Sequence, residues 1–223
     1  MTFCLLVVAK APVPGFAKTR LCPPATPAQA AEIAASALLD TLDTAFATDG
    51  AITVVAMTGD LAEAARGTEI GQALRKATVI AQRGWDFGTR LANAHSDTAA
   101  VHAGLPVLQI GMDTPQVSPG LLASAIKPVA AGASRAVLGG AEDGGWWGLG
   151  LADPRQAQVL AGVPMSRPDT GFRTRAALEA AGLRVGELPT LSDVDTMEDA
   201  VRVAAIRPDS RFAAAVDAVG VVA

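Results

Sequence analysis

The sequence is poor in cysteine and histidine and carries little excess charge. Cys4 and Cys22 have neither the spacing of a zinc site nor enough partners for a disulfide framework, and so few thiols fit a reducing cytoplasm. His95 and His102 lack an evident third ligand, which makes them weak candidates for a metal site. The net charge of -4, without long blocks of one sign, argues against nucleic-acid and membrane-surface partners. We therefore expect a cytoplasmic protein that binds small molecules.

Long apolar runs and the common phosphate-binding motifs are also missing. The opening MTFCLLVVAK has no basic start, and Lys10 ends its apolar run at the length of a strand, so a signal peptide is not indicated. No run approaches the ~20 apolar residues of a membrane-spanning helix. Neither GxxxxGK[ST] nor GxGxxG occurs. Any anionic ligand must therefore be held by local charges.

Half of the residues are hydrophobic, enough for one large domain spanning residues 1–223. Short apolar runs bounded by Gly or Pro predict strands. These runs are residues 3–9, 51–57, 78–81, 106–110, 135–138, 148–151 and 184–188. Helical patterns lie between them and at the end of the chain, at residues 26–46, 60–76, 86–102, from 118, 153–161, 169–181 and from 196 to 219. Strands alternating with helices predict a mainly parallel sheet with crossover helices.

The loop after the first strand, KAPVPGFAKTR, carries three cations. Lys10, Lys18 and Arg20 could surround a polyanion such as the phosphates of a nucleotide, Lys as a point charge and Arg as a planar fork. We include Pro12 and Gly15 of this loop among the nucleotide-binding residues. The alternative from charge alone is a solvated basic loop.

Three aspartates follow predicted strands. Asp113 stands just past the strand at 106–110, and ligands of α/β sheets gather outside the carboxyl ends of strands. Asp193 and Asp195 flank one valine, which in extended chain aims both carboxylates the same way, as suits a hard divalent cation. The alternatives are that Asp113 begins a turn and that the later acids cap the helix starting at Thr196.

Polar groups follow two further strands. Gln82 and Arg83 come directly after the third strand, where they could contact a base or phosphate. In the segment 139–148, four glycines flank an acidic pair, so that backbone at Gly144 could approach a ligand while Asp143 points a carboxylate into the same space.

Five segments in this order are KAPVPGFAKTRL, RGWDFGTRL, IGMDTP, AEDGGWWGLGL and DVDTMEDA. They resemble those of the bacterial DUF2064 family, also described as rSAM/selenodomain-associated transferase 1. That family belongs to the nucleotide-diphospho-sugar transferase superfamily and is similar to molybdenum-cofactor and phospholactate guanylyltransferases. The resemblance covers nearly the whole chain and implies a single GT-A type α/β domain, with a mainly parallel central sheet and helices on both faces.

The resemblance also implies a site. The nucleotide phosphates would lie at Lys10, Lys18 and Arg20, and Mg²⁺ or Mn²⁺ at Asp113 with Asp193 or Asp195.

Three functions follow as hypotheses. In nucleotidyl transfer, an acceptor phosphate attacks the α-phosphorus of a nucleoside triphosphate, and the enzyme aligns the groups and neutralises charge, with Lys18 and Arg20 in catalytic roles. In glycosyl transfer from a nucleoside-diphosphate sugar, Asp143 would act as base on an acceptor hydroxyl. A non-catalytic nucleotide-binding module is the third, suggested by Met112 and Thr114, which depart from the usual family pattern. The three cations of the first loop suit the charge of a triphosphate and therefore favour nucleotidyl transfer.

Overall fold

The computed structural model describes residues 1–132 and 135–220; the predicted domain also includes 133–134 and 221–223, which lie outside the described residues. Within the described residues, one seven-stranded sheet has the order β3-β2-β1-β4-β6-β5-β7. The strands are β1 (Phe3–Lys10), β2 (Ala51–Thr58), β3 (Thr78–Ala81), β4 (Val107–Gly111), β5 (Ala136–Ala141), β6 (Trp146–Leu151) and β7 (Val185–Leu191). Each lies within three residues of a predicted strand, and the predicted α/β fold with a mainly parallel sheet is confirmed.

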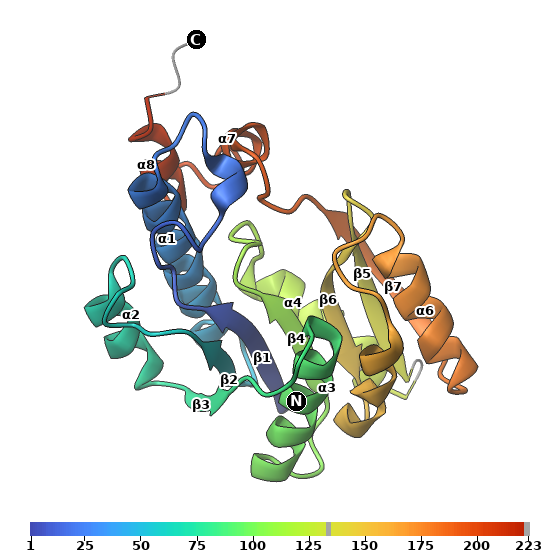
Figure 1. The fold of residues 1–223 in the computed structure, drawn as a ribbon. Coiled ribbons are helices and arrows are strands. Elements are labelled where there is room, and N and C mark those ends of the chain that lie inside the picture. Colours follow the sequence, from blue (N-terminus) through green and yellow to red (C-terminus); the bar gives the residue numbers. More distant parts are fainter. Residues whose placement is uncertain (133–134, 221–223) are drawn as a thin grey trace.

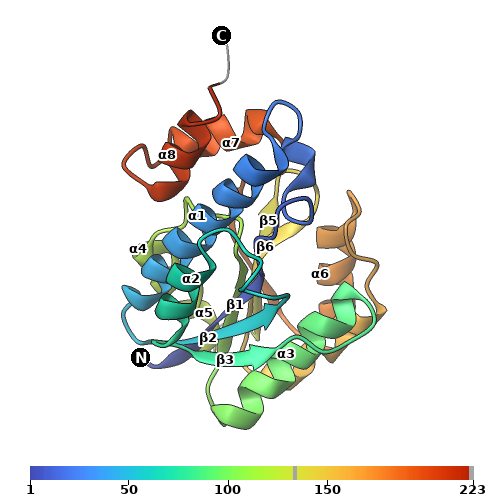
Figure 2. The same ribbon diagram turned by 60° about the vertical axis from the view of Figure 1, so that its left-hand side comes forward.

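Helices cover both faces of the sheet, as Figure 2 shows with the sheet between them. They are α1 (Pro27–Phe46), α2 (Gly67–Leu74), α3 (Phe87–Val101), α4 (Pro119–Ala125), α5 (Lys127–Ala130), α6 (Thr170–Ala180), α7 (Met197–Ala204) and α8 (Arg211–Asp217), with 3-10 helices η1 (Thr19–Leu21) and η2 (Pro154–Gly162). One face packs α1, α2, α4 and α5, and the other packs α3, η2 and α6. Helices α7 and α8 pack on the outer side of α1 (Figure 1). None of these helices is long and apolar enough to cross a membrane.

Strand β1 shows why the core has two halves. Phe3, Leu5 and Val7 belong to the apolar cluster beneath α1, whereas the alternate residues Cys4, Leu6 and Val8 belong to the cluster beneath α3 and η2. Successive side chains of a strand point to opposite faces, so a continuous apolar run is what a strand buried on both faces requires.

Of the described strands, β6 alone runs antiparallel to its neighbours β4 and β5. The cause is the short connection from β5, because four residues can join antiparallel strands as a hairpin but are too few for a parallel crossover. Gly139 makes room for this hairpin: a Cβ there would lie 2.4 Å from Nε1 of Trp147. The indole instead packs against the glycine backbone and donates to the carbonyl of Pro189 on β7 at 2.8 Å.

The helix predicted from residue 60 is wrong over residues 60–66, which form turns before α2 begins at Gly67. Asp60 accepts a hydrogen bond from the Ala62 amide at 2.8 Å, a local bond that competes with helix formation. The chain then doubles back so closely that a Cβ on Gly67 would lie 1.9 Å from the Leu61 carbonyl oxygen. Gly67 therefore marks the beginning of the helix.

The two histidines serve the scaffold. His95 is fully buried on α3, with Nε2 3.0 Å from Oε1 of Gln109 on β4, and His102 contacts Thr78 at 3.2 Å. Burial lowers the pKa of His95 from 6.5 to about 4, because the imidazolium would lose its hydration and the bond to Gln109 offsets this only in part.

We expect His95 to make the protein less stable in acid. Between pH 6.5 and 4 the unfolded chain binds a proton that the folded protein excludes, so His95 costs stability as the pH falls through this range. At about 1.4 kcal/mol per pKa unit, the loss approaches about 3 kcal/mol. Urea unfolding of the wild type and His95→Gln at several pH values measures it. His95→Gln should lose this part of the pH dependence, and the control His102→Gln should keep it. If the free energy of unfolding of His95→Gln changes with pH as steeply as that of the wild type, His95 is not the cause.

Candidate active site at the carboxyl edge of the sheet

The carboxyl ends of the parallel strands surround one cavity of about 520 Å³. Each of these strands contributes polar or flexible groups to its lining. They are Lys10 at the end of β1, Thr58 at the end of β2, Gln82 after β3, Met112 and Asp113 after β4, Asp143 after β5, and Asp193 and Asp195 after β7. Ligand sites of open α/β sheets lie at this edge, and the volume is that of a small-molecule site.

The loop after β1 forms one wall of the cavity. Its cations Lys10, Lys18 and Arg20 all line it, as predicted. Pro12 and Gly15 shape the loop instead: the Pro12 carbonyl accepts a hydrogen bond from the Ala65 amide at 3.0 Å, and Gly15 has a positive φ of 79°. The three cations therefore lie along one cavity, and their predicted contact with phosphates stays a prediction.

Lys18 joins acidic groups that are far apart in the sequence. Its Nζ lies 2.9 Å from Oδ2 of Asp113 and 3.6 Å from Oδ1 of Asp195, and it also donates to the Val194 carbonyl. Arg20 contacts the other oxygen of Asp195 from the solvent side, with Nη1 2.9 Å from Oδ2. The segments after β1, β4 and β7 thus meet through charge at one point.

These contacts shift the pKa values of the groups. Burial lowers the pKa of Lys18, but the charge and hydrogen bond of Asp113, with the charges of Asp195 and Asp193, outweigh it and raise the pKa. For Asp113, burial raises the pKa and Lys18 outweighs it, so the pKa is lowered. Burial raises the pKa of Asp193 to about 7, and the nearby charges of Asp113 and Asp143 add to this. Asp113, Asp193 and Asp195 therefore concentrate negative charge, which Lys18 and, from the solvent side, Arg20 neutralise in part.

The carboxylates offer the ligand chemistry of a divalent cation. Oδ1 of Asp193 is buried without a hydrogen-bond partner, and with Asp113 and Asp195 it supplies the oxygen ligands that Mg²⁺ and Mn²⁺ prefer. Within residues 1–132 and 135–220, however, no three acidic, histidine or cysteine side chains converge closely enough to hold a metal ion. Lys18 stands between Asp113 and Asp195. The oxygen donors are of the type that such an ion prefers, but in this arrangement they do not converge on one point and Lys18 lies between two of them.

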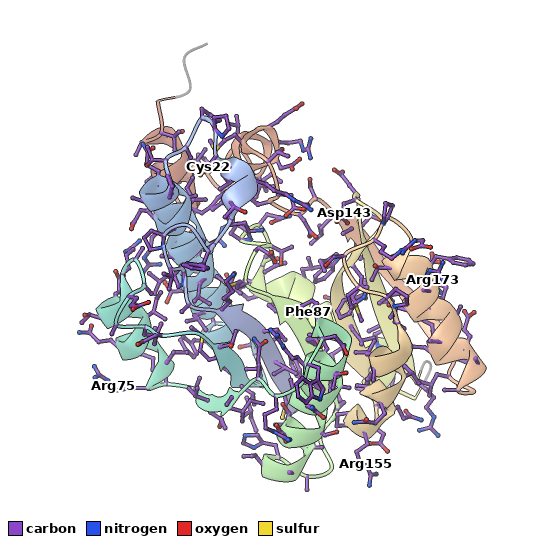
Figure 3. All side chains as sticks on the ribbon, viewed as in Figure 1. Cys22, Arg75, Phe87, Asp143, Arg155 and Arg173 are labelled. Carbon is purple, nitrogen blue, oxygen red and sulfur yellow. The ribbon has the colours of Figure 1, made fainter. Side chains whose placement is uncertain are left out.

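Asp143 lies at the tips of β5 and β6, and Phe87 at the start of α3 (Figure 3); both line the cavity. Oδ1 of Asp143 accepts a hydrogen bond from the Gly145 amide at 2.8 Å, which fixes the carboxylate on its turn. Asp143 therefore lies in the same cavity as Asp113, Asp193 and Asp195.

Other predicted residues have structural partners. Gln82 lines the cavity, but its amide donates to the carbonyls of Ala9 and Ala56 at 2.8 and 2.9 Å and ties the ends of β1 and β2 together. Arg83 pairs with Asp97 of α3 at 2.6 Å on the surface, outside the cavity lining. At Gly144 the close approach comes from the chain itself, because a Cβ would lie 1.8 Å from the Pro168 carbonyl oxygen.

The wall opposite the cationic loop was missed from the sequence. It is formed by Phe87, Arg90 and Leu91 of α3, Trp146 of β6, and Met165, Ser166, Arg167 and Thr170 before and at the start of α6. Asp86 caps α3 by accepting a hydrogen bond from the Thr89 amide, and Arg90 donates to the Gly84 carbonyl and lines this cavity. Ser166 has a positive φ of 58°, a conformation that non-glycine residues rarely adopt outside constrained sites. No local sequence pattern signals this loop.

A sequence profile of the family described as "Uncharacterized protein conserved in bacteria (DUF2064)" matches residues 41–167, more than half of the chain. The chain belongs to this family. The resemblance seen in the five sequence segments is therefore confirmed. A search of curated proteins finds no match.

Solved structures extend the likeness over the whole fold. A presumed nucleotide-diphospho-sugar transferase from Desulfovibrio desulfuricans G20 has a TM-score of 0.84 and 26% identity, covering 98% of this DUF2064 chain and 97% of that chain. CMP:2-keto-3-deoxy-manno-octonic acid synthetase complexed with CTP has a TM-score of 0.59 and 12% identity, covering 94% and 99%. Rv0371c of Mycobacterium tuberculosis H37Rv, in complex with manganese, has a TM-score of 0.51 and 19% identity, covering 91% of this chain and 98% of that chain. The last two likenesses concern the fold alone.

Proposed function

We propose that this DUF2064 protein is a metal-dependent transferase that uses a nucleotide-activated donor, and that it transfers a nucleotidyl group from a nucleoside triphosphate to a small phosphorylated acceptor. The observation that carries the proposal is the meeting of Lys18 with Asp113 and Asp195 at the carboxyl edge of the sheet, beside Lys10 and Arg20. A polyphosphate and its counter-cation need such a combination of charges.

The chain's own groups would act by alignment and charge neutralisation. Lys10, Lys18 and Arg20 would hold the phosphates from one wall, and the transferred group would gain negative charge that these cations offset. Arg90 and Arg167 lie on the opposite wall, where their positive charges would bind an anionic acceptor that faces the donor. Asp113, Asp193 and Asp195 would hold Mg²⁺ or Mn²⁺, which as a Lewis acid would neutralise phosphate oxygens when bound.

Two solved structures support this choice of chemistry by analogy of fold. One is complexed with CTP and named a CMP-sugar-acid synthetase, and another is in complex with manganese. Their low sequence identity leaves substrates open, so the donor and metal stand as proposals for this chain.

Glycosyl transfer is the second candidate, because Asp143 places a carboxylate in the same cavity. An acceptor hydroxyl would need such a general base, whereas an acceptor phosphate would not. The presumed nucleotide-diphospho-sugar transferase, with 26% identity, also favours this chemistry.

Thermal unfolding with a panel of donors separates the two candidates. In Mg²⁺, a nucleoside triphosphate at 100 times its Kd should raise the melting temperature by about 5–10 °C, because binding to the folded state alone stabilises it. The gain should vanish in EDTA. Larger gains with nucleoside-diphosphate sugars would replace nucleotidyl by glycosyl transfer, and the absence of any gain across both panels would contradict a nucleotide-dependent enzyme.

A further inference from the structure

Lys18 occupies the centre of the acidic cluster. Its side chain is only 15% exposed, and its ammonium contacts Asp113, Asp195 and the carbonyl of Val194 together. The ammonium donates hydrogen bonds to Asp113 and to the Val194 carbonyl, while Asp195 at 3.6 Å adds an attractive charge. Lys18 thereby serves as an internal counter-ion for carboxylates that come from two distant segments.

The backbone holds Lys18 in this place. Its φ of 47° and ψ of 43° lie in the left-handed region, at the start of η1. This conformation is unfavourable for a residue with a Cβ and persists where other contacts compensate. Leu21 of η1 is fully buried and anchors the turn. The position of the ammonium is therefore set by a built turn.

The same oxygens are those that a divalent cation would need. The Lys18 ammonium lies 2.9 Å from Oδ2 of Asp113 and 3.6 Å from Oδ1 of Asp195, so it takes up carboxylate oxygens that such a cation would need. Two cations cannot share that space without strong repulsion. Asp193, with one buried oxygen lacking any partner, shows that the lysine does not satisfy the cluster completely.

We propose that Lys18 closes the cation site in the free protein and couples metal binding to nucleotide binding. Its ammonium leaves the carboxylates for the nucleotide phosphates, so that a divalent cation binds tightly only with the nucleotide. This rests on the proposed function, in which both ligands occupy the same cavity. Because such coupling is reciprocal, the metal raises nucleotide affinity by the same factor.

Arg20 gives a contrast within the same cluster. It pairs with Asp195 at 2.9 Å, but its side chain is 74% exposed and extends into solvent. Its charge is screened and its guanidinium can swing away at little cost. Removing the charge of Arg20 should therefore change metal affinity little, whereas removing that of Lys18 should open the site.

The test is Mn²⁺ binding without nucleotide, measured by isothermal titration and by electron paramagnetic resonance of free Mn²⁺. Lys18→Met, which keeps much of the chain length and removes the charge, should bind Mn²⁺ at least about tenfold more tightly than the wild type, a typical size for coupling between sites. Arg20→Gln should stay within about twofold. Adding Asp113→Asn to Lys18→Met should abolish the gain.

Melting curves show whether the Lys18→Met protein is folded, and Lys18→Gln repeats the titration if it is not. Equal Mn²⁺ affinity of the wild type and both Lys18 variants overturns the inference, and so does an equal gain in Arg20→Gln. The proposed function fails separately, if the wild type binds no nucleotide in Mg²⁺. The Mn²⁺ comparison can be read in that case too, because it contains no nucleotide.

Discussion

Replacing Asp113 by asparagine is expected to lower the affinity for the donor nucleotide in Mg²⁺ by about 100-fold or more, and the rate of transfer by at least as much. Asp113 is the carboxylate that follows the central strand β4, and its charge is stabilised by Lys18 at 2.9 Å. An amide of the same shape keeps an oxygen for Lys18 but removes the charge that a hard cation requires.

The loss of nucleotide affinity in Asp113→Asn should disappear when the metal is removed. In EDTA the carboxylate of Asp113 only repels the phosphates, so Asp113→Asn should bind the nucleotide as well as the wild type or better. Isothermal titration of both proteins in Mg²⁺ and in EDTA gives the four affinities. If Asp113→Asn simply lost its structure, its nucleotide affinity would fall both in Mg²⁺ and in EDTA, and melting curves check for this.

Asp153→Asn is the matched control for Asp113→Asn. Asp153 also pairs with a basic residue at 2.9 Å, but its partner Arg155 lies at the opposite end of the molecule from Asp143 (Figure 3). The control should keep wild-type affinity in both buffers. If Asp113→Asn binds the nucleotide in Mg²⁺ as tightly as this control, Asp113 does not hold the metal.

The strands and the edge that carries the site could be predicted from sequence because both depend on local patterns. Apolar runs marked β1 and β4, and the polar residues just after them had to lie at one edge once the strands were parallel. These features need no knowledge of distant contacts. The antiparallel direction of β6 was not predicted, because the strands expected at 135–138 and 148–151 are nine residues apart, whereas only four residues separate β5 from β6 in the structure.

What could not be predicted depends on contacts between distant segments. Lys18 meets an aspartate 95 residues away, and which of three cations does so is decided by the left-handed turn at Lys18 itself. Arg167 and Ser166 enter the cavity because the loop before α6 is held to the β5–β6 hairpin by a 2.8 Å bond from the Gly171 amide to the Gly144 carbonyl. The hydrophobic periodicity of a sequence does not indicate which distant segments pack together.

That docking makes Gly144→Ala the most destabilising small change that we expect. Gly144 has a positive φ of 85°, and a Cβ there would lie 1.8 Å from the backbone oxygen of Pro168. A backbone atom cannot turn aside as a flexible side chain can, so the hairpin and the loop must separate. We expect a loss of about 3 kcal/mol or more in the free energy of unfolding, or about 6–12 °C in melting temperature.

Gly182→Ala isolates the cost of the backbone conformation. Gly182 has a similar φ of 81°, but a Cβ there meets nothing within 4 Å. Its free energy of unfolding should fall by only about 1–2 kcal/mol, the cost of placing a residue with a side chain in the left-handed conformation. The difference between the two variants in urea unfolding therefore measures the contact between Gly144 and Pro168.

The two variants should also differ in ligand binding. If the loop moves away in Gly144→Ala, it takes Ser166 and Arg167 from the cavity wall, and nucleotide or acceptor affinity falls even at temperatures where the variant is folded. Gly182→Ala, at the far end of α6, should bind like the wild type. Equal stability of the two variants would show that the hairpin and the loop before α6 can separate without cost. The wall that carries Arg167 would then not be fixed by Gly144.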